Sequence, residues 1–153
     1  MTRMPTFSEF TVSWLSTWAV VKLKASAYRE YESLIRIHLV PSIGELPLDE
    51  VTAERIQAYV AAKVAAGYSS RSVNNHVIVL RRVLQTAVEW GLLLENPVDM
   101  VARPRIERSE MSYLTPDELS RLIDATPASW RLLLALPAFG GLRKGECLAL
   151  EWT

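Results

Sequence analysis

The longest run of helical apolar spacing, which starts at Ser69 or Ser70 and ends at Gly91, limits most strongly how this chain can fold. Within it, apolar side chains recur every three or four residues, which places them on one face of an α-helix. A long apolar stripe of this kind needs other helices to cover it, so the run predicts a helical bundle. The stripe consists of Val73, Val77, Leu80, Leu84, Ala87 and Val88.

Three shorter helices are predicted before this run. The first begins at a capping box of Thr6 and Glu9, and the second runs from about Ser26 until Pro41 is expected to stop it. The third is expected to begin at Thr52 and to end at Gly67, which suits a left-handed cap. The residues expected to face inward are Phe7, Phe10, Trp14 and Trp18; Tyr31, Leu34, Ile35, His38 and Leu39; and Ile56, Tyr59, Val60 and Val64.

After Gly91 the helical pattern is interrupted and then resumes. Residues 96–112 contain two prolines, Arg103, Arg105 and Arg108, and they are expected to form a basic linker. The sequence TPDE is a second capping box and starts a helix at Thr115. Two more helices are expected at 129–139 and from Leu142 onward. We therefore predict an all-α chain with a four-helix domain at 1–95, a linker at 96–112 and the start of a second helical domain at 113–153.

Composition excludes several classes of protein. The single cysteine, Cys147, excludes a disulfide framework and indicates a reducing compartment. The two histidines, His38 and His76, lack the spacing of a zinc site, so no metal is expected and both are predicted to be structural. The N-terminus has no signal peptide, and the longest late apolar stretch, LLLALPAF, is too short for a membrane span. A cytoplasmic protein without a membrane partner is expected.

Charge is balanced overall but unevenly distributed. Seventeen basic residues oppose seventeen acidic ones, and a net charge of zero argues against a nucleic-acid-binding protein. Between Glu54 and Glu89, however, there is no acidic residue. A local surplus is sufficient for a binding face. The basic residues of this window are Arg55, Lys63, Arg71, Arg81 and Arg82.

The side of the longest helix opposite its apolar stripe is the candidate DNA-binding face. Arg71, Asn75 and Arg82 lie there, since they are separated by four and seven residues, with Asn74 and Arg81 beside them. Arginine binds guanine edges or phosphates, and asparagine can pair with adenine. The alternative is an ordinary solvated helix face. Further candidates for phosphate contact are Lys63, Ser69, Ser70, Arg103, Arg105 and Arg108. A weaker set of candidates lies in a region whose positive charge is offset by Glu30 and Glu32; it consists of Lys22, Lys24, Arg29 and Arg36.

The sequence GGLRKGECLALEW near the C-terminus suggests a second anion site. The glycine pair places Arg143 at the start of a helix, where backbone N–H groups and a guanidinium can bind the same phosphate. The alternative is a surface arginine paired with Glu146 one turn later.

Taken in order, these segments resemble the tyrosine recombinases, or phage integrases. The sequence GGLRKGECLALEW is similar to the first arginine box of that family, with Gly140 where the family has threonine. Upstream, SSRSVNNHVIVLRRVLQTAVEWGLLLENPV, the basic linker and YLTPDEL match the succession from the SAM-like core-binding domain to the start of the catalytic domain. The resemblance covers nearly the whole chain.

The resemblance implies a reaction and roles for individual residues. A tyrosine attacks a DNA phosphate, and a 5′-hydroxyl reverses the step, without a cofactor or small-molecule substrate. Arg143 would bind the scissile phosphate, and Glu146 would support it. The other catalytic groups normally follow this box, and no His-x-x-Arg sequence occurs here. The five tyrosines all precede Arg143, at positions 28, 31, 59, 68 and 113.

The predicted function is therefore the DNA-binding front part of a recombinase that is inactive alone. It would bind double-stranded DNA and, on DNA, other recombinase protomers. On this interpretation the chain is cut short by design, by proteolysis or by a natural stop. Two alternatives are a naturally truncated, non-cutting DNA-binding module and a helical protein-interaction domain with no role on DNA.

Overall fold

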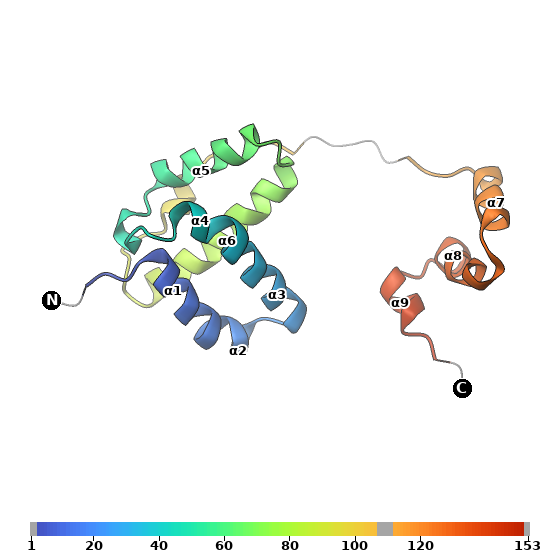
Figure 1. Ribbon diagram of the computed structural model, residues 1–153, viewed down its shortest axis with the longest axis horizontal. Helices are drawn as coiled ribbons and strands as arrows, with labels where there is room; N and C mark the ends of the chain where they lie inside the picture. The colour runs from blue at the N-terminus through green and yellow to red at the C-terminus, as the bar shows by residue number, and fades with distance from the viewer. Residues whose placement is uncertain (1–2, 107–111, 152–153) are drawn as a thin grey trace. The chain divides into compact units, whose positions relative to one another are not determined.

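The computed structural model describes residues 3–106 and 112–151, and these are helical, as predicted (Figure 1). The only β feature among them is an isolated antiparallel bridge between Thr6 and Pro47. The chain divides into two compact units, Met1–Glu107 and Arg108–Thr153, which we describe separately. No helix of the described ranges is long and apolar enough to cross a membrane.

The first helix of the first unit is longer than one regular α-helix. It consists of α1 (Phe7–Trp14), a π-helical segment η1 (Leu15–Ala19) and α2 (Val20–Lys22). The capping box of Thr6 and Glu9 forms as predicted. The indole of Trp14 is fully buried and donates a hydrogen bond to the hydroxyl of Thr86 at 3.0 Å, which ties this helix to α6.

The second helix corrects the prediction for Pro41. It runs through α3 (Ala25–Leu34), a second π-helical segment η2 (Ile35–Leu39) and α4 (Val40–Ile43), so the proline does not end it. Pro41 lies in the first turn of α4, directly after the wider π turn, where a residue without a backbone N–H is tolerated. Gly44 and Pro47 of the turn that follows lead into a short 3₁₀ helix, η3 (Leu48–Glu50).

The third and fourth helices begin and end where the sequence predicts. Thr52 caps α5 (Ala53–Ala65), and Ser69 caps α6 (Ser70–Glu89). Gly67 and Gly91 follow them with φ angles of 82° and 74°, in the left-handed region that glycine adopts without strain. The prediction that Val64 faces inward was wrong, because its side chain is about half exposed.

Helix α6 is more deeply buried than its apolar stripe predicts. The stripe residues are buried except for Val88, which is half-buried. A second strip of α6 is also covered, because α3, α5 and the chain after Asn96 all pack against this helix. The additional buried residues are His76, Val79, Val83 and Thr86.

Residues 96–104, the first part of the predicted linker, pack against the helices of the first unit. The 3₁₀ helix η4 (Pro97–Met100) packs against α5 and α6, and Val98 and Val101 are buried in the core of the first unit. The side chain of Asn96 caps η4 and donates hydrogen bonds to the carbonyl of Arg81 and to Gln85. Side-chain bonds to α5 and α6 hold a segment that has no helical periodicity of its own.

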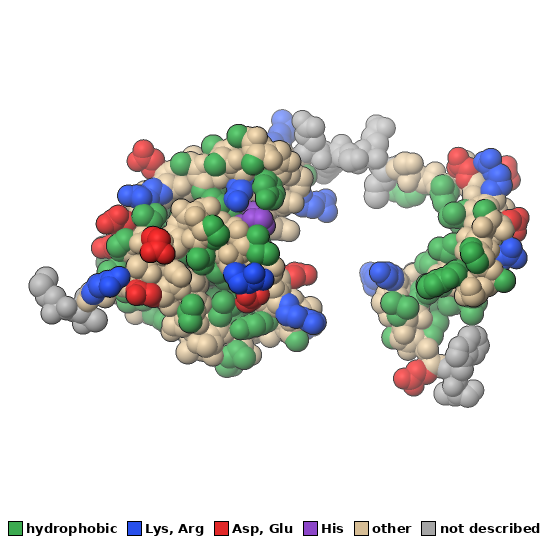
Figure 2. All heavy atoms as spheres, in the orientation of Figure 1, with side chains coloured by type: hydrophobic (Ala, Val, Ile, Leu, Met, Phe, Trp, Pro, Cys, Tyr) green, Lys and Arg blue, Asp and Glu red, His purple; other side chains and the backbone are tan. Residues whose placement is uncertain are grey.

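The second unit contains α7 (Pro116–Ala125), α8 (Ala128–Gly140) and α9 (Lys144–Leu148). The capping box of Thr115 and Glu118 forms, whereas the last helix begins at Lys144 and not at Leu142. Among residues 112–151, Cys147 alone is buried. Large apolar side chains are open on this unit, as Figure 2 shows, and Trp130, Phe139 and Leu148 are each at least 60% exposed. Trp152 lies outside the described residues.

Candidate nucleic-acid interface

Three adjoining hollows lie between the second helix and α6, and we call them together the α3–α6 groove. Their volumes are about 460, 350 and 510 Å³. The first two share Glu30, Leu34 and Asn75, and the last two share Tyr31 and Ile78. The exposed edge of α6 therefore borders one continuous depression, with histidines at one end and basic residues at the other.

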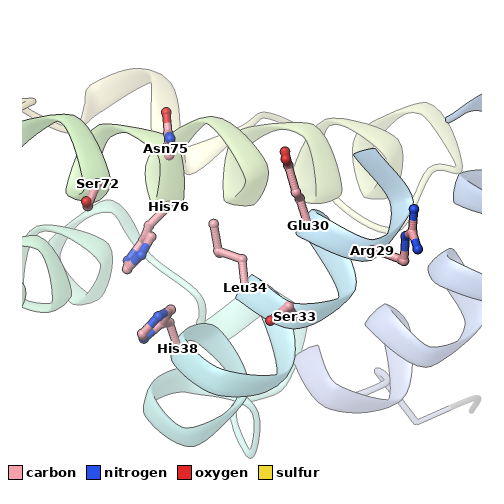
Figure 3. A pocket seen from close by; sticks show the side chains of 8 residues that line it. All are labelled: Arg29, Glu30, Ser33, Leu34, His38, Ser72, Asn75 and His76. Atoms are coloured by element: carbon pink, nitrogen blue, oxygen red, sulfur yellow. The ribbon is translucent and has the colours of Figure 1, made fainter. Parts of the chain in front are cut away.

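At the histidine end, His38 from η2 and His76 from α6 face one another (Figure 3). Their rings stack with centroids 4.5 Å apart, and Nδ1 of His76 lies 2.7 Å from the hydroxyl of Tyr59. Burial, followed by the charges of His38 and Lys63, lowers the pKa of His76 from 6.5 to about 4. Burial also lowers the pKa of His38. The pair is not completely covered, since Figure 2 shows a histidine at the surface of this unit. The two rings pack against one another, a contact that the sequence did not show.

Lys63, a predicted phosphate contact, lies beside this pair. Its ammonium group lies 5.4 Å from the ring centre of Tyr59 and 5.2 Å from that of Tyr68. Tyr68 in turn meets His38 edge to face. The aromatic rings hold the ammonium group in place. Burial is the main cause of the lowered pKa of both histidines, and the charge of Lys63 lowers it further.

The exposed side of α6 carries the residues that were predicted to bind DNA. Arg71, Asn75 and Arg82 are exposed, and Asn75 lines the histidine end, pointing away from the two stacked rings in Figure 3. Ser69 is occupied as the cap of α6, because its Oγ accepts the backbone N–H of Ser72 at 3.1 Å. Ser70 is half-buried.

Two neighbours on α6 have partners within the chain. Asn74 is half-buried and donates from Nδ2 to the carbonyl of Pro104 at 3.0 Å. Arg81 donates from Nε to Asp99 at 2.7 Å, and this hydrogen bond raises the pKa of its guanidinium. These contacts fasten residues 96–104 to α6 and leave Asn74 and Arg81 less available to a ligand than the sequence suggests.

The basic end of the groove is lined by Lys22, Arg81, Arg82 and Arg103. The guanidinium of Arg82 lies 4.3 Å from the ring centre of Trp18. Trp18 was predicted to be core. It packs against the core and stacks on the buried Trp14, but it is only half-buried and also lines the groove. Phe7, Phe10 and Trp14 are buried as predicted.

The remaining basic candidates differ in their surroundings. Arg29 lines the histidine end together with Glu30, and Arg36 is paired with Glu32 at 2.9 Å. Lys24 and Arg105 are exposed. Arg108 lies outside the described residues.

Arg143 forms a separate candidate site in the second unit. Its backbone N–H donates to Oε2 of Glu146 at 2.8 Å, and its Nη1 lies 3.3 Å from Oε1 of the same carboxylate. The guanidinium is 88% exposed, so it can bind an anion while Glu146 fixes its orientation. Gly141, in the left-handed conformation with φ 66°, ends α8 and turns the chain toward Arg143.

The described residues contain no group of three or more histidine, cysteine or carboxylate side chains arranged to hold a metal ion. Sequence analysis missed that Trp18 lines the groove and that Gln57 holds the chain after η4. The side chain of Gln57 pairs with both backbone groups of Ala102. No local pattern marks a contact between residues so far apart in the sequence.

Comparison with known proteins agrees with this architecture. The family model described as "Phage integrase, N-terminal SAM-like domain" matches residues 6–64. The chain is 28% identical over 132 residues to the ICEBs1 integrase of Bacillus subtilis (strain 168), which covers 84% of this chain and 36% of that relative. The chain thus spans about a third of the length of this integrase.

Two solved structures are also similar to this chain. A phage integrase SAM-like domain from Moorella thermoacetica has a TM-score of 0.60 and 31% identity, with coverage of 71% of this chain and 95% of that domain. A lambda integrase dimer bound to a COC′ core site gives a TM-score of 0.82 at 21% identity, with coverage of 98% of this chain and 43% of that one. The second likeness shows the fold.

Proposed function

The chain belongs to the phage integrase, or tyrosine recombinase, family, and we propose that it is the DNA-binding part of a site-specific recombinase. The observation that carries the proposal is the exposed side of α6. Arg71, Asn75 and Arg82 lie opposite the buried stripe, within a stretch without an acidic residue. A positively charged helix face on a rigid bundle suits the major groove of DNA.

The proposed roles divide between phosphates and bases. Arg71 and Arg82 bind phosphates or guanine, and Asn75 reads a base edge. Lys63, Ser69, Ser70 and Arg105 contribute phosphate contacts at the margins of the face.

The second unit, on this proposal, is the start of a catalytic domain. The exposed guanidinium of Arg143 binds the scissile phosphate. Glu146 holds Arg143 in place, because one carboxylate oxygen contacts the guanidinium and the other accepts the backbone N–H. No tyrosine follows Arg143 in the chain, so we propose that it does not cut DNA by itself. The first unit, which includes residues 96–104, is the core-binding domain.

The partner is double-stranded DNA, and on DNA other protomers. Lambda integrase, with which the chain shares its fold, has been solved as a dimer bound to a core site and as a tetramer bound to a Holliday junction. The same partner classes are proposed here.

Titration of a labelled mixed-sequence duplex with the whole chain, at several salt concentrations, tests the proposal. Phosphate contacts release counterions, so the logarithm of the affinity should fall linearly with the logarithm of the salt concentration. A combined Arg71→Ala and Arg82→Ala variant should bind more weakly and with a smaller slope. Arg55→Ala is a matched control, because Arg55 is an exposed arginine on α5 that is paired with Glu50 outside the α3–α6 groove. Absence of salt-dependent binding by the unmodified chain would favour a protein-interaction domain instead.

A further inference from the structure

The basic end of the α3–α6 groove combines cations from three separate segments of the first unit. Lys22 comes from α2, Arg82 from α6 and Arg103 from the chain after η4. They line a hollow of about 510 Å³, and among the described residues that line it there is no carboxylate. Arg81 also lines it but is already paired with Asp99, so three cationic side chains remain for a ligand.

Arg82 is held on two sides. Its guanidinium lies over Trp18, and Trp18 stacks on the buried Trp14 with ring centres 5.1 Å apart. Trp14 donates to the hydroxyl of Thr86, and that hydroxyl donates in turn to the backbone carbonyl of Arg82 at 3.1 Å. Stacking on a supported indole restricts the guanidinium before any ligand arrives.

Arg103 is held through its two sequence neighbours. The backbone N–H of Ala102 donates to Oε1 of Gln57 at 2.8 Å, and Nε2 of Gln57 donates to the Ala102 carbonyl at 3.3 Å. On the other side, Asn74 donates to the Pro104 carbonyl. Oδ1 of Asn74 is buried and has no donor among the described groups, so stability alone does not explain an asparagine here.

We propose that this hollow is a preorganised site for the backbone phosphates of duplex DNA. Lys22, Arg82 and Arg103 are its phosphate ligands. Trp18 is a positioning residue for the Arg82 guanidinium, and Gln57 and Asn74 are positioning residues for the backbone on either side of Arg103. The planar fork of arginine suits phosphate, and restricting it beforehand lowers the entropic cost of binding. The inference rests on the proposed function, since it assumes that duplex DNA binds to the first unit.

A double-mutant cycle on the whole chain tests the positioning role. Arg103→Ala should weaken duplex binding and lower the salt slope by about one. Gln57→Ala should weaken binding by about 2- to 10-fold, because the backbone that carries Arg103 must then be ordered on binding. In the Arg103→Ala background, Gln57→Ala should have no further effect. Arg55→Ala, on the same helix as Gln57, should change neither the affinity nor the salt slope.

Several outcomes would overturn the inference without touching the proposed function. One is salt-dependent binding by the unmodified chain together with an unchanged salt slope in Arg103→Ala. Another is an equal loss from Gln57→Ala in both backgrounds, which would mean that Gln57 acts through the fold. A third is binding of inorganic phosphate that depends on Arg103 while duplex binding does not. Loss of salt dependence in the unmodified chain would instead contradict the proposed function itself.

Discussion

The imidazole rings of His38 and His76 stack at 4.5 Å between two helices of the first unit, with their planes 23° apart. Two imidazoles at this distance cannot both become charged without repulsion, and Lys63 adds a third positive group nearby. Protonation of either ring therefore costs free energy in the folded chain. The histidine pair therefore makes the stability of the bundle depend on pH.

The first prediction follows from the pKa of His76. In the folded chain it is about 4, and in the unfolded chain it returns to about 6.5, so between these values the unfolded state binds more protons. The contribution of His76 to the free energy of unfolding is complete above pH 6.5 and should decrease as the pH falls toward 4. The difference in pKa corresponds to at most about 3 kcal/mol. Urea denaturation at several pH values measures this change.

His76→Asn is the matched variant for that measurement. It removes the titrating ring and leaves every carboxylate of the chain in place, so the difference between the two proteins isolates His76. The variant should lose less stability between pH 6.5 and 4 than the unmodified chain. Parallel pH profiles for the two proteins would contradict the assignment.

The second prediction concerns the bond between Trp14 and Thr86. Both side chains are fully buried, and Thr86→Val keeps the shape while it removes the acceptor for the indole N–H. An unsatisfied buried donor costs about 1–3 kcal/mol, which thermal or urea unfolding would detect. Thr17→Val is the control, because Thr17 is exposed and lies in the same helix as Trp14. Its effect on the free energy of unfolding should stay within about 0.5 kcal/mol. Equal effects of the two substitutions would show that the bond contributes nothing.

The third prediction compares the two units. The first unit has a continuous apolar core, whereas in residues 112–151 Cys147 alone is buried. Amides of α7 and α8 should therefore exchange with solvent faster than those of α6, because few buried contacts oppose local opening. Hydrogen-exchange mass spectrometry at several protein concentrations would measure this. Equal protection of both units at every concentration would contradict the expectation, and protection that grows with concentration would indicate self-association through the open apolar side chains.

Features that depend on neighbouring residues could be predicted from the sequence. The capping boxes at Thr6 and Thr115, the caps at Thr52 and Ser69, and the left-handed glycines all form, because each needs only residues within one helical turn. The exposed side of α6 was predictable for the same reason. A period of 3.6 residues fixes which side chains oppose a buried stripe.

Features that depend on contacts between distant residues could not be predicted. Gln57 meets Ala102, and Asn74 meets Pro104, across 45 and 30 residues of chain. These bonds turn an apparent linker into part of the bundle. Pro41 was misjudged for a different reason, since a preceding π turn allows the helix to pass through the proline and propensity rules assume a regular helix.

The fourth prediction concerns catalysis. A nicked suicide substrate that traps phosphotyrosyl intermediates should yield no denaturation-resistant adduct with this chain, because all five tyrosines precede Arg143. Tyr59 is further disfavoured, since it is buried and its pKa is raised by burial. Gel electrophoresis after protease treatment and peptide mapping would detect an adduct. An adduct that maps to any of these tyrosines would refute the proposal that this chain does not cut DNA by itself.

The last prediction separates the roles of the three exposed residues on α6. A residue that reads a base should cost about 1–3 kcal/mol when it is lost and should relax sequence preference at one position. A phosphate contact should weaken binding to all sequences alike and lower the salt slope by about one. We expect the first result for Asn75→Ala, and the second for Arg82→Ala, because Trp18 holds the Arg82 guanidinium at the basic end of the groove.

Selection of preferred duplexes from a random pool, followed by titration of preferred and scrambled sequences, provides the measurement. Arg71→Ala should follow one pattern or the other, and either result assigns its contact. Circular dichroism of each variant controls for folding, which should be intact because all three side chains are exposed. If all three variants retain the affinity, sequence preference and salt slope of the unmodified chain, DNA binds to a different face of the bundle.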